Sequence, residues 1–315
     1  MVSERIAVLG LGTMGHGIAQ VFASTGHRVR CYDSAARARD TLKDRIRGNM
    51  EQKARLGLSP GLDPEAVLGR IEVVSELEPS VQGADFVVEA VREDLPTKKD
   101  LFKRLEDLVS HETVLASNTS TFPMTGMARG LRHPQRTLVT HWFNPPHIIP
   151  LVEVVPGRET VEETVGRTMD LLERNGKVAI RLHKEVPGFL VNRIQAAVFR
   201  EIWDLVEQGV ATPEQVDQAV SASIGLRLAA AGPFEIADFA GLDITGHVFG
   251  HLLKEIASSR KLPPAVDRLV QEGHYGVKSG RGIYEYTPER IEERQSRRDR
   301  LFLRLVELLH SDPSA

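Results

Sequence analysis

The sequence has a single cysteine, Cys31, among its 315 residues. No intrachain disulfide can form and a cysteine-rich metal cage is excluded, so we expect no metal centre and a reducing, cytoplasmic location. Long apolar runs are also missing. The stretch Ile6–Leu11 is too short for a signal peptide, and no later run reaches the roughly 18 residues of a membrane span. We therefore expect a soluble protein without membrane association.

Charge of one sign does not dominate, because 40 lysines and arginines face 43 aspartates and glutamates, which gives a net charge of −3. Such a chain has no basic field for coating nucleic acid and no polybasic membrane anchor, so neither partner is expected. At roughly 150 residues per domain, the length predicts about two domains. A chain of this size can bury a sizeable core without disulfides or metal ions.

Up to about residue 180, short β-branched runs alternate with helical patterns. Several runs, such as Ile6–Leu9 and Phe86–Val88, are apolar on both faces, as is typical of strands that helices cover on both sides. This alternation predicts an α/β fold with a doubly wound, Rossmann-type sheet. The expected strands are Arg5–Leu9, Arg28–Asp33, Ile71–Val74, Phe86–Glu89, Val114–Ser117, Leu138–His141, Leu151–Val155 and Val178–Arg181.

After about residue 186 the strand pattern stops, and Val186-Pro187-Gly188 breaks the chain. We therefore predict two domains: a Rossmann domain over residues 1–184 and an all-α domain over residues 185–315. The helices expected in the second domain are Phe189–Glu207, one starting at Thr212-Pro213, one starting near Pro233, and Pro288–His310.

Two local patterns make sharper predictions about helix ends and packing. Thr160, with Glu163 three residues later, is a capping box, so we expect a helix that begins at Thr160 and ends before Gly176. Near the C-terminus, leucines recur at helical spacing and are expected to be buried against this chain or a partner. They are Leu301, Leu305 and Leu308.

A glycine-rich turn, Gly10-Leu11-Gly12-Thr13-Met14-Gly15, follows an expected strand and opens a helix. Gly10 permits the tight turn, Gly12 lets the backbone approach a pyrophosphate, and Gly15 lets helix and strand pack closely. The free N–H groups of the helix N-terminus then hold the anion. Asp33 ends the next strand and would accept both ribose hydroxyls while repelling a 2′-phosphate, which favours NAD over NADP. An ordinary glycine-rich turn is the alternative.

His141 ends another expected strand, and the prolines of Asn144-Pro145-Pro146 force the chain to turn soon afterwards. The following strand returns beside or near the first and carries Glu153 among apolar residues. A buried acid needs a partner, and His141 is the nearest plausible one. A histidine held by a carboxylate keeps one tautomer and gains basicity, as an acceptor of an alcohol proton must.

Two further polar groups allow a functional and a structural interpretation. Ser117-Asn118-Thr119-Ser120 closes a strand at the edge where open α/β sheets bind ligands, but it could equally be an N-cap cluster for the next helix. Asn192, just past the Pro-Gly break, could be an ordinary polar residue at a helix start. Residue types and spacing alone do not separate these interpretations.

Across nearly its whole length the chain resembles the L-3-hydroxyacyl-CoA dehydrogenase family. Several motifs match in the family's order, which makes the resemblance specific. They are the glycine-rich turn, Val88-Glu89-Ala90-Val91, Ser117-Asn118-Thr119-Ser120, His141-Trp142-Phe143-Asn144-Pro145, Leu151-Val152-Glu153-Val154, Pro187-Gly188-Phe189-Leu190-Val191-Asn192-Arg193 and Lys278-Ser279-Gly280-Arg281-Gly282.

The resemblance implies roles for these residues. It makes His141 the general base, Glu153 the acid that orients it, and Ser120 and Asn192 the hydrogen-bond partners of the substrate oxygen. It also implies NAD-dependent, reversible oxidation of an L-3-hydroxyacyl compound to the 3-keto product, a place in fatty acid metabolism, and a homodimer formed through the C-terminal domain. The expected cofactor residues are Gly10, Gly12, Thr13, Met14, Gly15, Asp33, Glu93, Lys98 and Asn118.

The substrate could be a coenzyme A thioester or a free hydroxy acid, either L-gulonate-like or like a hydroxy- or formyl-pyridine carboxylate. The tract Pro145–Pro150 resembles relatives that act on free acids, and the helix after Asp33 offers only Lys53 and Arg55 where fatty-acid enzymes carry a lysine-rich coenzyme A clamp. We expect Asn144 to contact substrate and Arg227 to hold a carboxylate, although Arg227 could instead pair with a nearby acid. Two other segments look like those of acyl-CoA enzymes, namely Asp238–Asp243 and Lys278–Gly282.

A hypothesis of another class is a non-catalytic NAD-binding protein, structural or sensory, on the same fold. The complete set of Ser120, His141, Glu153 and Asn192 argues against it, since structure alone requires none of these side chains.

Overall fold

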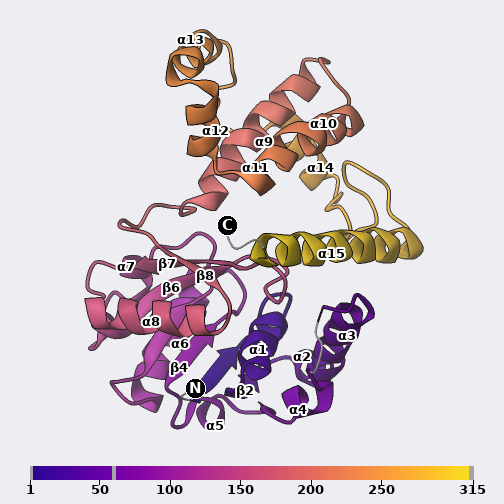
Figure 1. The fold of residues 1–315 in the computed structure, drawn as a ribbon. Coiled ribbons are helices and arrows are strands. Elements are labelled where there is room, and N and C mark those ends of the chain that lie inside the picture. Colours follow the sequence, from indigo (N-terminus) through magenta and orange to yellow (C-terminus); the bar gives the residue numbers. More distant parts are fainter. Residues whose placement is uncertain (1–2, 59–61, 312–315) are drawn as a thin grey trace. The chain divides into compact units, whose positions relative to one another are not determined.

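The computed structural model describes residues 3–58 and 62–311 (Figure 1). The chain divides into two compact units. One ends at Asn192 and also includes the C-terminal segment from Gln295, and the other is Arg193–Arg294. The first unit contains the sheet and the second is helical. The sequence predicts that the C-terminal segment lies in the second domain, residues 185–315. In the structure this segment belongs to the unit that carries the sheet.

Eight strands form one sheet in the order β3-β2-β1-β4-β5-β6-β7-β8. Strands β1–β6 are parallel to one another, whereas β7 is antiparallel to β6 and parallel to β8. The carboxyl ends of β1–β6 therefore meet at one edge of the sheet. All eight predicted strands are confirmed: β1 (Arg5–Leu9), β2 (Arg28–Tyr32), β3 (Ile71–Val74), β4 (Phe86–Glu89), β5 (Val114–Ser117), β6 (Thr137–Trp142), β7 (Leu151–Pro156) and β8 (Val178–Arg181).

Helices connect the strands and make up the second unit; within the described residues, none is long and apolar enough to cross a bilayer. Those of the first unit are α1 (Gly15–Ser24), α2 (Ala36–Asp40), α3 (Leu42–Arg55), α4 (Pro64–Leu68), α5 (Leu77–Val81), α6 (Leu95–Leu108), α7 (Met124–Met127), the 3₁₀ turn η1 (Pro134–Arg136) and α8 (Glu162–Arg174). Those that follow are α9 (Val191–Glu207), α10 (Pro213–Val220), the π-helical turn η2 (Ser221–Gly225), α11 (Leu226–Ala230), α12 (Pro233–Ala240), α13 (Leu242–Leu252), α14 (Pro264–Gln271) and α15 (Pro288–Ser311).

Alternating residues of the central strands enter two separate cores. Ile6 and Val8 of β1 pack with α1, α3 and α8 on one face, and Ala7 and Leu9 pack with α5, α6 and α7 on the other. Because helices cover both faces, these strands are apolar on both sides, as their sequence indicated. The predicted doubly wound Rossmann sheet, followed by a helical part, is confirmed.

The capping box expected at Thr160 is wrong. Helix α8 begins two residues later, at Glu162, and its N-cap is Val161 without a side-chain cap. The Thr160 hydroxyl instead donates to the carbonyl of Thr137 (2.6 Å) and accepts from the N–H of Gly157 (2.8 Å). This side chain therefore fastens the turn after β7 to the start of β6, which leaves it no role at the helix end.

The leucine stripe expected to be buried along the C-terminal helix is exposed on this chain. Leu303 of α15 is buried, whereas Leu301, Leu305 and Leu308 are all exposed. A different side of helix α15 faces the rest of the first unit. Its residues Leu303, Val306 and Glu307 line the same cavity as part of α3. Leu301, Leu305 and Leu308 are therefore not buried against this chain, and their burial against a partner stays a prediction.

Candidate active site

The glycine-rich turn after β1 can be built only with glycine at two positions. Gly10 has φ +91°, and a Cβ there would lie 2.4 Å from the carbonyl oxygen of Ala90; a Cβ on Gly15 would lie 1.8 Å from the carbonyl oxygen of Gly10. At Gly12, by contrast, no atom of the described residues other than Gly12 and its two chain neighbours lies within 4 Å of the Cβ position. The turn is therefore tight against β4 and α1 but open at Gly12, as close approach of a pyrophosphate requires.

Asp33 follows β2 directly and faces this turn. Its Oδ2 accepts from the N–H of Leu11 (2.7 Å) and its Oδ1 from the N–H of Ala35 (2.8 Å). Each oxygen keeps a lone pair for a ribose hydroxyl. Arg45 of α3, which the sequence did not single out, donates to the carbonyls of Leu11 (2.8 Å) and Gly12 (3.2 Å) and so holds the turn from its other side.

A cavity of about 810 Å³ opens over the carboxyl ends of the strands. The turn, Asp33 and the loops after β4 and β5 line it. The glycine-rich turn and Asp33 in its lining suit the pyrophosphate and ribose of a dinucleotide. Two predicted cofactor residues, Gly15 and Lys98, are not part of the lining. The predicted residues that do line it are Gly10, Gly12, Thr13, Met14, Asp33, Glu93, Asn118 and Ser120.

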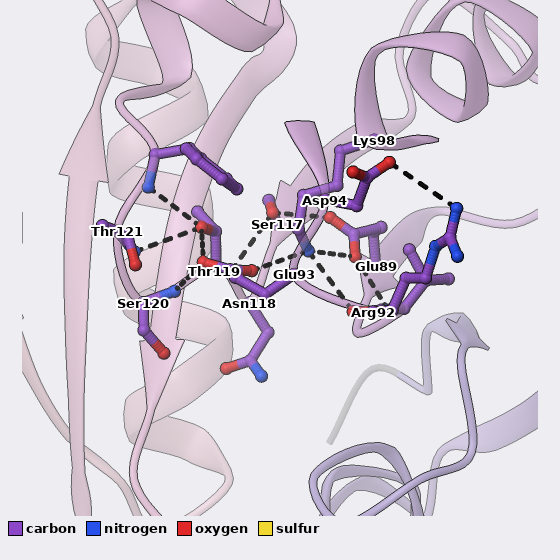
Figure 2. A network of polar contacts seen from close by, with 12 residues as sticks. Glu89, Arg92, Glu93, Asp94, Lys98, Ser117, Asn118, Thr119, Ser120 and Thr121 are labelled. Carbon is purple, nitrogen blue, oxygen red and sulfur yellow. Dashed lines mark hydrogen bonds and ion pairs between the residues drawn. The ribbon is translucent and has the colours of Figure 1, made fainter. Parts of the chain in front are cut away.

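Lys98 lies in a buried polar network (Figure 2). Its ammonium group is 2.7 Å from Oε1 of Glu89 and 3.3 Å from Oε2 of Glu93, and Lys98 and Glu89 are both fully buried. Glu89 also accepts from the hydroxyl of Ser117 (2.6 Å) and the N–H of Val91 (2.8 Å). Lys98 therefore acts on the cavity through Glu93. Glu89 was missed as a site residue, and a glutamate closing an otherwise apolar strand was the signal that could have found it.

Glu93 connects the loops after β4 and β5. Its Oε1 accepts from the hydroxyl of Thr119 (2.5 Å) and from the N–H of Ser120 (3.0 Å). Figure 2 shows the Asn118 and Ser120 side chains directed away from the network around Lys98. The side-chain amide oxygen of Asn118, Oδ1, accepts from the backbone N–H of Trp142 (3.0 Å), the residue after His141. The cavity wall is thus tied to the end of β6.

His141 and Glu153 face each other across the antiparallel pair β6 and β7. His141 Nδ1 is 2.6 Å from Oε2 of Glu153, and both side chains are buried. The other carboxylate oxygen, Oε1, accepts from the N–H groups of Leu190 (3.1 Å) and Val191 (2.9 Å). Because a carboxylate oxygen accepts, Nδ1 carries the proton and Nε2 is left as a proton acceptor. The pairing expected from the sequence is present.

The remaining predicted residues differ in how the structure places them. Asn192, in the first turn of α9, donates to the backbone carbonyl of Ser120 (3.4 Å), which brings these two residues together. Asn144 is exposed, precedes the cis peptide to Pro145, and forms no hydrogen bond within the described residues. Arg227 is an exposed residue of α11 in the second unit.

Lys177 fastens the loop that connects β6 to β7. Its ammonium group donates to the carbonyls of Pro146 (2.6 Å) and Ile149 (2.9 Å). Burial lowers the pKa of Lys177 to about 7, and the charge of Lys53 adds to the effect. Burial likewise lowers the pKa of His147, in the same loop, to about 3. The loop after His141 is therefore held by a group whose charge depends on pH near neutrality.

We expect the free energy of unfolding to rise with pH above 7, relative to a Lys177→Met variant. The folded-state pKa of Lys177 lies below its ordinary value of 10.5, so between these pH values the unfolded chain binds a proton that the folded chain does not. The expected difference in slope is at most about 1.4 kcal/mol per pH unit. Urea unfolding of both proteins at several pH values from neutral upward measures it, and identical slopes would contradict the expectation.

Two family models match the chain. Residues 5–186 match the NAD binding domain of 3-hydroxyacyl-CoA dehydrogenase, and residues 188–286 match its C-terminal domain. Together they span nearly the whole chain, and their junction lies at the Pro-Gly break before α9.

Similar proteins include enzymes of two substrate classes. A 5-formyl-3-hydroxy-2-methylpyridine 4-carboxylate 5-dehydrogenase of Mesorhizobium japonicum is 36% identical over 306 residues, 97% of this chain and 98% of the relative. A probable 3-hydroxybutyryl-CoA dehydrogenase of Bacillus subtilis is 36% identical over 287 residues, 91% of this chain and 98% of the relative. A crystal structure of the pyridine-carboxylate enzyme, described as an NAD⁺-dependent dismutase, superposes with a TM-score of 0.91 at 34% identity, covering 98% of this chain and 99% of that one.

Proposed function

The chain belongs to the 3-hydroxyacyl-CoA dehydrogenase family of NAD-dependent oxidoreductases, and from that premise we propose that His141 is its general base, acting on the hydroxyl of a 3-hydroxyacyl-type substrate. The observation that carries this proposal is the buried His141–Glu153 pair, tied through Asn118 and Trp142 to the cavity that fits a dinucleotide. A fold alone does not require such a pair.

The proposed mechanism assigns each polar group one task. Nε2 of His141 takes the hydroxyl proton, and Glu153 stabilises the imidazolium that forms. Ser120 and Asn192 donate hydrogen bonds to the substrate oxygen as negative charge develops on it, in a site where such bonds are stronger than in water. NAD, when bound, supplies the hydride acceptor. The glycine-rich turn, Asp33, Glu93 and Asn118 would hold it, with Lys98 fixing Glu93.

We further propose that the substrate is a compact free carboxylic acid. Of the five basic residues of helix α3, which include Lys43 and Lys53, the three arginines already have partners and are less available to the phosphates of coenzyme A. Arg45 donates to the glycine-rich turn, Arg47 pairs with Asp44 and Glu65, and Arg55 pairs with Glu51. Helix α15 shares a cavity wall with Met50, Lys53 and Ala54 of α3 and so narrows the space beside Lys53. The match to the pyridine-carboxylate enzyme over 98% of the chain supports the same class.

An acyl-CoA thioester is the second candidate, favoured by the family models and by the Bacillus relative. Absorbance of NADH, followed with acetoacetate, a sugar acid, a pyridine carboxylate and acetoacetyl-CoA, compares the two classes. Turnover of a free acid but not of the thioester is the expected result. A preference for acetoacetyl-CoA would show that the substrate is a thioester and not a free acid. If the protein binds NAD but turns over none of these compounds, the dehydrogenase mechanism itself is contradicted.

Arg227→Ala is expected to raise KM for a free acid about tenfold and to leave KM for a thioester unchanged. The guanidinium is exposed, forms no ion pair or hydrogen bond in the described part of the chain, and follows the π-helical turn η2, a feature frequent at functional sites. A bidentate contact to a carboxylate would account for the loss. Steady-state kinetics with both substrate classes measures it, and an equal rise in KM for both would contradict a carboxylate contact.

We also propose a homodimer formed through the second unit. Between Arg193 and Arg294 no residue is fully buried, and large apolar side chains such as Phe234 and Phe239 are 87% and 84% exposed. Apolar surface on this scale marks an interface. Light scattering on the protein as it elutes from a size-exclusion column is expected to give twice the chain mass of 34.9 kDa. The double variant Phe234→Glu/Phe239→Glu is expected to be monomeric. A monomeric wild-type protein would contradict this.

The single buried cysteine supports a cytoplasmic setting.

A further inference from the structure

Two aromatic rings lie close to the imidazole of His141. The ring of Phe143 lies 4.5 Å from it, centroid to centroid, at an interplanar angle of 55°, and the ring of Phe189 lies 5.5 Å away at 53°. Phe143 is half-buried, whereas Phe189 is completely buried. The hydrogen bond to Glu153 fixes one atom of the imidazole, and the two rings limit how the rest of it can tilt.

Phe189 reaches this position through an unfavourable backbone conformation. Its φ is +52°, and among the described residues it is the only non-glycine residue with a positive φ. The preceding residue, Gly188, has φ +76°. A side chain with a Cβ is disfavoured in this region, and such conformations persist only where the surroundings hold them and cluster at functional sites.

The same backbone conformation places two donors on the carboxylate of Glu153. Directly after Phe189, the N–H groups of Leu190 and Val191 both donate to Oε1 of Glu153. Successive N–H groups that follow left-handed residues form a concave site for an anion. The other oxygen, Oε2, is thereby left to His141. One short segment thus both orients the carboxylate through its backbone and packs against the imidazole through its ring.

We infer that Phe189 is a positioning residue for His141. Its ring keeps the imidazole in the orientation set by Glu153 and excludes water from the pair, and its left-handed backbone lets the ring and the two N–H donors act on the same pair. Phe189 touches no reacting atom. The inference rests on the proposed role of His141 as general base, and it predicts that loss of the ring impairs proton transfer more than substrate binding, because a small misplacement of a catalytic group is costly.

Phe189→Leu keeps an apolar side chain but removes the ring. We expect kcat for the preferred substrate to fall at least tenfold with KM within about twofold of wild type, and the pH profile of kcat/KM to differ from that of wild type. Phe102→Leu is the matched control, because Phe102 is equally buried in the same core face but is not among the rings that contact His141. The control is expected to keep kcat, KM and the pH profile.

The same experiment includes wild type and His141→Gln at a temperature where circular dichroism shows all four proteins folded. A fall in kcat for His141→Gln and Phe189→Leu, but not for Phe102→Leu, supports the inference. A Phe189→Leu variant that matches Phe102→Leu in kcat and pH profile overturns it while leaving the role of His141 intact. A His141→Gln variant with wild-type kcat overturns the proposed mechanism itself, which is a distinguishable result.

Discussion

His141→Gln is expected to lower kcat by about 10²–10⁴ while leaving the affinity for NADH unchanged. Glutamine is uncharged at every accessible pH and cannot take the hydroxyl proton, so the variant loses the share of catalysis that a positioned general base supplies. It is close to histidine in size, and the carboxylate of Glu153 keeps its two backbone donors, Leu190 and Val191. Steady-state rates with the preferred substrate measure the loss, and a fluorescence titration with NADH measures the affinity.

The surface offers a matched control for this variant. His111 lies next to Glu112, with Nε2 2.9 Å from a carboxylate oxygen, but both side chains are about 70% exposed. His111→Gln breaks a histidine–glutamate pair of the same chemistry that is exposed to water, where such pairs contribute little to stability. Its kcat is expected to equal that of the wild type. A comparable loss in both variants, or no loss in His141→Gln, would contradict the assignment of the base.

The pairing of His141 with Glu153 could be predicted from the sequence because short-range constraints place the two residues side by side. The two prolines after Asn144 end β6, so the chain turns within a few residues, and an antiparallel return then sets the two strands side by side. Similarly, the glycine-rich turn is specified by backbone conformation, which only glycine satisfies at Gly10. Local rules of this kind carry over directly from sequence to structure.

Features that depend on long-range packing could not be predicted in the same way. The contact of Glu153 with the start of α9 joins residues 37 and 38 positions apart, and nothing local announces it. Thr160 has the sequence of a capping residue, but a carbonyl of β6 competes successfully for its hydroxyl. Which side of α15 is buried, that of Leu303, depends on where the chain places this helix against α3.

Lys98 shows the same limit at the site itself. The resemblance assigned it to the cofactor, yet it lies beneath Glu93 and pairs with the buried Glu89, a residue 9 positions earlier. Glu89 comes at the end of an apolar strand, where a carboxylate is costly without a partner. A buried cation and two carboxylates from β4, α6 and the loop between them form one network, whose members can be recognised only together.

Lys98→Met is expected to lower the free energy of unfolding by about 3–5 kcal/mol, the usual result of breaking a buried ion pair from one side. Methionine fills similar volume, so the loss comes from Glu89, which stays completely buried and, among the described residues, keeps the Ser117 hydroxyl and the Val91 N–H as its donors. Glu93 also loses its cation, which weakens its hold on the loop after β5 and is expected to raise the Kd for NADH. Urea unfolding and NADH titration measure the two effects.

The double variant Lys98→Met with Glu89→Gln separates charge from packing. It removes the buried charge together with its partner, and replacing both members of such a pair is far less costly than removing one. We expect it to regain more than half of the lost stability, whereas Lys99→Met, at the exposed neighbouring position on α6, changes stability by less than about 0.5 kcal/mol. If Lys98→Met proves as stable as Lys99→Met, Lys98 is not what stabilises Glu89. If the double variant is no better than Lys98→Met, the loss arises from packing around the lysine stem.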